Sequence, residues 1–341
     1  MPKILVTGGA GFIGSHTVIE LLNNGYDVVI VDNLVNSEKF ILKKIEEITG
    51  KTPTFYQVDC ANTNELVTVF NQHPDIALAI HFAALKAVKE SIEKPLEYYR
   101  NNLLSLISLL DLMDRFGIEK FVFSSSCTIY GEDAPLPMDE NLQIMPTTSP
   151  YGRTKQMCES ILADYAVVNS NFKYISLRYF NPIGAHPSGL IGELPIGSPN
   201  NLVPYITQTA AGVRDELKVF GSDYSTPDGT AQRDYIDIMD LAQAHVQSVD
   251  RLINRLEPQQ FEAFNLGSGK PVSVKEIIDT FERVNGIHLK WSFAPRRAGD
   301  LPTIYADSKK AKEVLKWEAK TSLAESLANA WKWERSHRNI D

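Results

Sequence analysis

The segment SPYGRTK, residues 149–155, contains the two side chains with the clearest capacity for chemistry. Tyr151 and Lys155 are separated by four positions, so on a helix both side chains lie on the same face. Tyrosine ordinarily has a pKa of about 10, and it can act as a base at neutral pH only if its surroundings lower that pKa by roughly 3 units. A neighbouring ammonium and a helix N-terminus both favour such a change. The pair therefore indicates a candidate base, provided that other features support it.

Three consecutive serines, at 124–126, end the apolar run that starts at residue 120. A hydroxyl at the end of a strand commonly caps a neighbouring backbone group, which is the simpler interpretation for Ser124 and Ser125. Ser126 lies furthest beyond the strand, and its surroundings lack the GxSxG pattern of a hydrolase nucleophile. We therefore expect Ser126 to hydrogen-bond a reacting group rather than to attack it.

A glycine-rich turn, TGGAGFIGSH at residues 7–16, follows the first apolar run. Gly8, Gly11 and Gly14 permit a tight turn and a close approach of the backbone to a pyrophosphate at the N-terminus of the next helix. Asp32 ends the second apolar run, where an acid can accept both ribose hydroxyls of an adenosine. Because its carboxylate would repel a 2′-phosphate, the sequence predicts NAD rather than NADP.

These residues require a scaffold, and the first half of the chain predicts a parallel sheet. Short apolar runs alternate with segments whose apolar residues recur every three or four positions, which is typical of strands joined by crossover helices. The expected fold is α/β, a Rossmann-type doubly wound sheet with a helix over 151–168 that has Ser149 as N-cap and Pro150 in its first turn. The expected strands are residues 3–8, 27–32, 54–59, 78–83, 120–125 and 173–179.

The pattern changes after residue 180. Residues 181–204 are rich in Pro and Gly without periodicity, and they are expected to form a long loop of the kind that is usually functional. Later segments interleave strand and helix patterns, including a strand at 263–267, the loop APRRAGDLP and two terminal helices. We expect residues 1–180 to form an NAD-binding domain and 181–341 to form a smaller α/β substrate lobe, with some segments returning to the first domain.

Composition limits the other classes of function. The chain of 341 residues carries a net charge of −8, which argues against nucleic acid as a partner, because phosphate backbones are bound by clustered Lys and Arg. No apolar run approaches the ~20 residues of a membrane helix, and the N-terminus enters a strand without room for a signal peptide. Three cysteines without a CxxC pair suit a reducing compartment. We expect a soluble cytoplasmic protein without a metal, since its histidines form no HxxxH or Cys/His cluster.

Residues at the carboxyl ends of the other expected strands should line one crevice, because ligands of doubly wound sheets bind there. Phe82, Ala83, Ala84 and Lys86, within HFAALKAVKES, are therefore expected to face the cofactor. Asp59 ends the third expected strand, where it could hydrogen-bond the adenine amino group or act as a helix cap.

Across nearly the whole chain these stretches resemble the extended branch of the short-chain dehydrogenase/reductase superfamily that acts on nucleotide sugars, and within it the UDP-glucose 4-epimerase group. The resemblance implies an enzyme of galactose metabolism that reversibly 4-epimerises UDP-glucose and UDP-galactose. Tightly bound NAD would take a hydride from carbon 4 and return it to the other face of a 4-keto sugar. The stretches that carry the resemblance, in matching order and spacing, are TGGAGFIGSHT, DNLVNS, HFAALKAVKESIEKPLEYYRNN, FSSSCTIYG, SPYGRTK, RYFNPIGAHPSG, PNNLVPYI, GTAQRDYIDIMDLA and APRRAGDLP.

The resemblance also implies roles for single residues. Tyr151 would take the proton of the sugar 4-hydroxyl, and Ser126 would hydrogen-bond the same oxygen. Lys155 would bind the nicotinamide ribose and lower the pKa of the phenol, while Asp32 would hold the adenosine ribose. The other residues of the implied cofactor site are Phe12, Ile13, Asn33, Ser37, Asp59, Cys60, Asn101, Ser124 and Tyr179, and Lys86 would also touch the substrate.

The second lobe would then bind the nucleotide sugar. Arg233 and Arg297 would clamp its diphosphate, since guanidinium matches phosphate bidentately, and Asp300 would hold the uridine ribose. Ile304 falls where the family varies a side chain against the sugar ring, a small residue being associated with admitting N-acetylated sugars and a bulky one with excluding them. Isoleucine is intermediate, so acceptance of UDP-N-acetylglucosamine stays open. The sugar and uracil contacts would come from Asn181, Asn201, Leu202, Lys218, Val219 and Phe220.

Other functions compete with this one. A 4,6-dehydratase of nucleotide sugars needs Thr-Asp-Glu after the fifth strand, where this chain has Ser126-Cys127-Thr128 and so lacks the required acid and base. A preference for UDP-N-acetylglucosamine and UDP-N-acetylgalactosamine, or dual specificity, stays open. A non-catalytic NAD-binding regulatory protein would be expected to lose Tyr151 or Lys155, and both are present.

Two helical segments carry apolar residues beyond what packing on one sheet face requires. They are residues 96–117 and the helix that begins near Tyr151. We therefore expect a homodimer that forms through a bundle of these helices.

Overall fold

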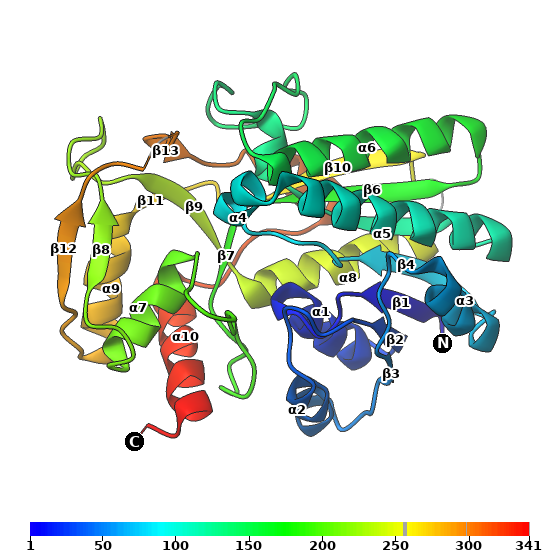
Figure 1. Cartoon of the computed structure of the whole chain (residues 1–341), viewed down its shortest axis with the longest axis horizontal. Coiled ribbons are helices and arrows are strands. Elements are labelled where there is room, and N and C mark those ends of the chain that lie inside the picture. The colour runs from blue at the N-terminus through cyan, green and yellow to red at the C-terminus, as the bar shows by residue number, and fades with distance from the viewer. Residues whose placement is uncertain (255–257, 298, 341) are drawn as a thin grey trace.

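The computed structural model describes residues 1–254, 258–297 and 299–340. A seven-stranded sheet in the order β10-β6-β5-β4-β1-β2-β3 forms its larger half, and every neighbouring pair in it is parallel (Figure 1). The predicted α/β doubly wound fold is confirmed. Six of the seven strands overlap the runs expected in the first half of the chain. β3 ends three residues before the predicted 59, and β4 spans 76–81 rather than the predicted 78–83. The strands are β1 Lys3–Thr7, β2 Asp27–Val31, β3 Thr54–Tyr56, β4 Ile76–His81, β5 Lys120–Ser126, β6 Lys173–Tyr179 and β10 Phe261–Leu266.

Helices cover both faces of this sheet because its strands are apolar on both sides. In β1, Ile4 and Val6 belong to one hydrophobic cluster, whereas Leu5 between them belongs to another. The first cluster includes residues of α1 (Phe12–Asn23), α2 (Phe40–Thr49) and α8 (Ile238–Asn254). The second includes residues of α3 (Thr63–Gln72), α5 (Pro95–Phe116) and α6 (Pro150–Val168). The short α4 (Val88–Glu93) lies between β4 and α5.

The second lobe is built around smaller sheets (Figure 1). β9 (Gln232–Asp237) pairs with β7 (Asn181–Ile183), β11 (Pro271–Ser273) and β13 (Thr303–Ile304), while β8 (Leu217–Phe220) pairs with β12 (Trp291–Ala294). Residues 181–204 were expected to be loop throughout, but β7 takes the first three of them and α7 the last three. The lobe also contains α7 (Leu202–Ala210), α9 (Val274–Asn285) and α10 (Leu323–Arg338), and these helices share a core that includes Ile206, Phe281 and Leu327.

The chain crosses between the two lobes more than once. β9 leads directly into α8, which packs against α1, and β10 then joins the edge of the main sheet beside β6. Two elements from the second half of the chain, α8 and β10, thus pack with the elements of the first half. The two predicted terminal helices are a single π-helical turn, Ala311–Leu315, and α10.

Candidate active site

The N-terminus of α6 places Tyr151 at the carboxyl end of β5. Ser149 caps the helix, since its Oγ accepts a hydrogen bond from the backbone N–H of Gly152 at 3.1 Å, and Pro150 occupies the first turn. A Cβ at Gly152 would lie 2.6 Å from the Thr147 Oγ1 atom, so only glycine fits there. The predicted start of the helix is confirmed.

The three side chains predicted to be catalytic lie together at this helix start and the end of β5. The Lys155 Nζ atom donates to the Ser124 carbonyl at 2.5 Å and lies 6.0 Å from the centroid of the Tyr151 ring. The Ser126 hydroxyl acts on Tyr151 by lowering its pKa, and its Oγ accepts from the N–H and the hydroxyl of Thr128 at 3.2 and 3.0 Å. Strand β5 therefore supplies a hydroxyl and a carbonyl to the polar groups of α6.

Burial controls the protonation of this pair. It raises the pKa of Tyr151 to about 12, although the hydrogen bond with Ser126 acts in the opposite direction. Burial also lowers the pKa of Lys155 to about 8, against the influence of Cys158 and Glu159. The side chains around Tyr151 therefore do not supply the lowered tyrosine pKa that the sequence argument required.

The glycine-rich turn lies directly after β1, as predicted. Gly8 has a φ of +70°, and a Cβ there would lie 2.8 Å from the backbone N of Ala83, which follows β4. A Cβ at Gly14 would lie 2.2 Å from the Gly8 carbonyl oxygen. Both positions thus require glycine. The turn is a cradle that side chains would fill, which fits the pyrophosphate of a dinucleotide.

Asp32 closes this turn from the end of β2. One carboxylate oxygen accepts from the Ala10 N–H at 3.0 Å, and the other accepts from the Leu34 N–H and the Ser37 hydroxyl, both at 2.9 Å. The structure thus brings the predicted ribose contacts Asp32 and Ser37 together. Asn33 lies beside them and accepts from the Val35 N–H. The neighbouring Phe12 and Ile13 begin α1.

Other predicted cofactor residues lie along the carboxyl ends of β3, β4 and β6. The Tyr179 hydroxyl is 2.6 Å from the His245 Nε2 atom, and the ring of His245 lies 4.8 Å from that of Phe82. His245 was not predicted, because a lone histidine in the α8 pattern carries no motif. The remaining predicted residues have ordinary contacts: Asp59 accepts from the Ala61 N–H, Asn101 donates to Asn102, Cys60 is buried, and Ala84 is half-buried before Lys86.

The residues predicted to hold the diphosphate and uridine lie around β9 and the segment after β12. Arg233 and Asp300, which were expected to contact different parts of the ligand, form an ion pair with each other. Arg233 also donates to the Leu301 carbonyl at 2.9 Å. The Arg297 guanidinium lies 4.1 Å from the centroid of the Phe220 ring. Next to this site, Lys218 donates to Ser292, and Val219 is buried in the core of the lobe.

Four further predicted contacts lie in the second lobe. Asn181 begins β7, and Asn201 precedes Leu202, the first residue of α7. Ile304 in β13 packs against a cluster that contains Ile129 and Phe180. Residue 129 belongs to the turn that follows Ser126, so this cluster connects that turn with β13.

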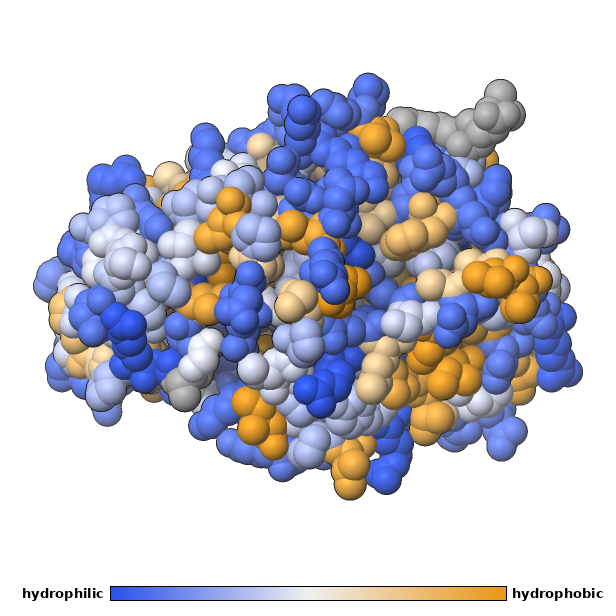
Figure 2. Space-filling view, turned by 90° about the horizontal axis from the view of Figure 1, so that it is seen from above, coloured by the Kyte–Doolittle hydropathy of each residue, from blue (hydrophilic) through white to orange (hydrophobic). Residues whose placement is uncertain are grey.

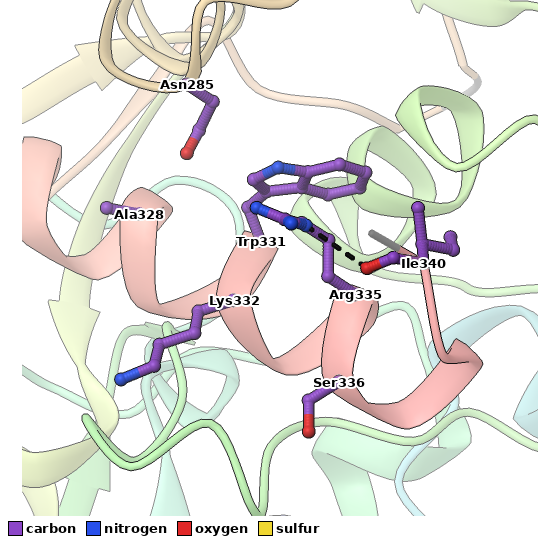
Figure 3. A pocket seen from close by; sticks show the side chains of 7 residues that line it. All are labelled: Asn285, Ala328, Trp331, Lys332, Arg335, Ser336 and Ile340. Carbon is purple, nitrogen blue, oxygen red and sulfur yellow. Dashed lines mark hydrogen bonds between the residues drawn. The ribbon is translucent and has the colours of Figure 1, made fainter.

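A hollow of about 430 Å³ lies elsewhere, on α10, and Figure 3 shows Trp331 and Arg335 at its centre. No predicted site residue lines it. Within residues 1–254, 258–297 and 299–340, no group of three His, Cys, Asp or Glu side chains could hold a metal ion. No helix in these ranges is long and apolar enough to cross a membrane.

The chain is similar to known proteins over nearly its whole length. Residues 4–267 match the family described as the NAD dependent epimerase/dehydratase family. The UDP-glucose 4-epimerase of Bacillus subtilis is 48% identical over 98% of this chain and 98% of its own length, and that of Erwinia amylovora is 49% identical over 99% of each. A crystal structure of UDP-glucose 4-epimerase from Bifidobacterium longum, in complex with NAD+ and UDP, has a TM-score of 0.94 and 44% identity, covering 99% of this chain and 100% of that one.

Proposed function

This chain belongs to the NAD dependent epimerase/dehydratase family, and we propose that it interconverts UDP-glucose and UDP-galactose by inverting carbon 4 of the sugar. The observation that carries the proposal is the cluster of Tyr151, Ser126 and Lys155 beside a dinucleotide turn. Full-length similarity to UDP-glucose 4-epimerases supports the choice of reaction and of substrate.

In the proposed mechanism, Tyr151 takes the proton of the sugar 4-hydroxyl and later returns it. Ser126 lies close enough to Tyr151 to lower its pKa, so its hydroxyl would hydrogen-bond the same substrate oxygen as the phenol. Lys155 places a buried ammonium near the Tyr151 ring, with the Ser124 carbonyl as its hydrogen-bond partner. NAD, when bound in the glycine turn and at Asp32, would supply the acceptor for the hydride of carbon 4, and the positive charge of its oxidised ring would favour an ionised phenol.

We assign the cofactor to the first lobe and the UDP-sugar to the second. The glycine turn and Asp32 would hold the two ends of the adenosine diphosphate, and residues 1–180 together with α8 and β10 form that lobe. Residues 181–341 would hold the uridine and its diphosphate through Arg233, Arg297 and Asp300. Arg233 and Asp300 already form an ion pair. This assignment therefore requires either that the ligand binds to both residues while they stay paired, or that it separates them.

The experiment that tests this function uses the purified protein without added NAD. UDP-galactose should appear from UDP-glucose, because the cofactor is expected to stay bound through purification. A parallel reaction with UDP-N-acetylglucosamine measures the competing preference. Failure to form UDP-galactose, even after NAD is supplied, would remove the proposed function.

Ile304 is expected to limit the use of N-acetylated sugars. Replacing it by glycine should raise kcat/KM for UDP-N-acetylglucosamine relative to UDP-glucose by roughly tenfold, since a few methylenes in a pocket are worth about 1–3 kcal/mol. Steady-state kinetics with both substrates gives the ratio. Ile304→Leu, which keeps the bulk against Ile129 and Phe180, is the control. An unchanged ratio in Ile304→Gly excludes position 304 as a determinant of specificity.

We also propose a homodimer that forms through α5 and α6. Apolar side chains are exposed there, and Figure 2, which looks down on these helices, shows hydrophobic residues over the half of the molecule that they cover. A face of this kind commonly marks an interface. Light scattering at micromolar concentration should give twice the mass of one chain, and a monomeric mass would contradict the proposal. The exposed residues on this side are Val88, Ile92, Leu96, Leu104, Ile107 and Met157.

A cytoplasmic location and a role in galactose metabolism complete the proposal. Cys60, Cys127 and Cys158 are all free thiols, as a reducing compartment would keep them. Fractionation of cells that make the protein would test the location, and enrichment in an oxidising compartment would contradict it.

A further inference from the structure

Glu193, in the segment between β7 and α7, connects three parts of the molecule. Its backbone carbonyl accepts a hydrogen bond from the Trp333 Nε1–H of α10 at 3.1 Å. The preceding Gly192 packs so closely on the same indole that a Cβ there would lie 2.4 Å from the ring. The position of Glu193 is therefore fixed against α10 through its main chain.

The side chain of Glu193 contacts residues of both lobes. Its Oε1 atom accepts from the Asn201 Nδ2 atom at 2.6 Å and lies 3.3 Å from the Lys86 Nζ atom. Lys86 follows β4 in the first lobe, and Asn201 precedes α7 in the second. The Glu193 side chain is 11% exposed, whereas that of Lys86 is 57% exposed. One carboxylate thus joins a predicted cofactor residue to a predicted uridine residue.

Helix α10 adds a second connection between the same lobes. The Trp333 ring stacks on His337 with centroids 4.9 Å apart, and His337 stacks on Phe40 of α2 at 6.0 Å. The helix that holds the Glu193 carbonyl therefore also touches the first lobe. Because α10 contacts both lobes, the backbone of Glu193 is held in place, and its side chain can position its two partners.

The charge of Glu193 shows that it does not serve to attract the ligands. NAD and a UDP-sugar are both anionic at their diphosphates, and a carboxylate near them repels them unless a cation neutralises it. Lys86 provides that neutralisation. Such a group is useful only if it sets the relative position of the elements that it joins.

We propose that Glu193 is a positioning residue for the reaction. By contacting both Lys86 and Asn201, it fixes the position of the segment after β4 relative to the N-terminus of α7. The inference rests on the proposed epimerisation. Loss of the bridge should misalign the sugar relative to the cofactor, and small errors in alignment reduce the rate of the chemical step far more than they reduce binding. The bridge is expected to act on kcat rather than on affinity for UDP.

The test compares Glu193→Ala and Glu193→Gln with Glu47→Gln. The control removes the charge of an exposed ion pair on α2 that does not join the lobes. We expect kcat per bound NAD to fall about tenfold in Glu193→Ala and less in Glu193→Gln, which can still accept from Asn201. The affinity for UDP, measured by calorimetry, should change less than about threefold, because the proposed diphosphate contacts Arg233 and Arg297 remain.

Hydrogen exchange gives a readout that does not depend on turnover. Glu193→Ala should accelerate exchange both at residues 83–90 and at 199–205, while Glu47→Gln leaves both segments unchanged. A kcat within about twofold of the parent, a loss of UDP affinity at unchanged kcat, or faster exchange at 199–205 alone would each overturn the inference. If the parent itself does not turn over UDP-glucose, the proposed function fails, and exchange at the two segments still decides whether Glu193 joins them.

Discussion

Replacing Tyr151 by phenylalanine is expected to lower kcat for the interconversion by about a thousandfold or more while NAD stays bound. The substitution removes only the hydroxyl, and proton transfer by a positioned side chain typically contributes a factor of about 10² to 10⁴. Here the loss should lie in the upper part of that range, because Tyr151 is the phenol that both Ser126 and Lys155 contact. Product formation and the NAD released on denaturation measure the two quantities.

Tyr165→Phe is the matched control for that substitution. Tyr165 lies on the same helix, and its hydroxyl donates to Asp114 at 3.0 Å, away from Ser126. It should turn over at the parent's rate. A kcat of the Tyr151→Phe variant above a tenth of the parent's would show that Tyr151 does not carry the proton.

Replacing Lys155 by methionine is expected to lower kcat by about a hundredfold and to reduce the fraction of protein that retains NAD. Methionine keeps most of the buried volume, so the main loss is the ammonium, which donates to the Ser124 carbonyl at 2.5 Å and lies 4.8 Å from the Phe123 ring centroid. Without this charge, the ionised form of Tyr151 becomes less stable. Steady-state rates and bound NAD are measured as for Tyr151→Phe.

The pH dependence of kcat shows whether the charged form of Lys155 raises or lowers the rate. Burial lowers the pKa of Lys155 to about 8, so the charged form dominates below pH 8 and is lost as the pH rises through that value. The parent's kcat should fall above about pH 8, and Lys155→Met should lack this fall. Lys89→Met, which changes an exposed lysine on α4, should keep the parent's profile. A parent rate that does not fall between pH 8 and pH 10 would contradict a requirement for charged Lys155.

Features determined by local sequence were predicted well. The start of α6 follows from a capping serine and a proline, and both act within a few residues. The glycine turn was also predicted, although its strict requirement for glycine at position 8 depends on Ala83, which lies far along the chain. The strands of the main sheet were found because they are continuous apolar runs buried on both faces.

Features that depend on long-range contacts were not predictable. Strands β7, β11 and β13 contain two or three residues each and exist because β9 lies between them, so the sequence shows no period for them. The raised pKa of Tyr151 arises from burial by distant segments. The ion pair between Arg233 and Asp300 likewise joins residues that sequence reasoning treats separately.

The most direct test of hydride return follows UDP-glucose that carries deuterium at carbon 4, with the purified protein in ordinary water. The hydride is predicted to return to the carbon that it left, so UDP-galactose should retain the deuterium at carbon 4. Magnetic resonance of the product measures the retained label. Replacement of the deuterium by hydrogen from the solvent would contradict a hydride held on bound NAD and would indicate inversion through a proton exchanged with water.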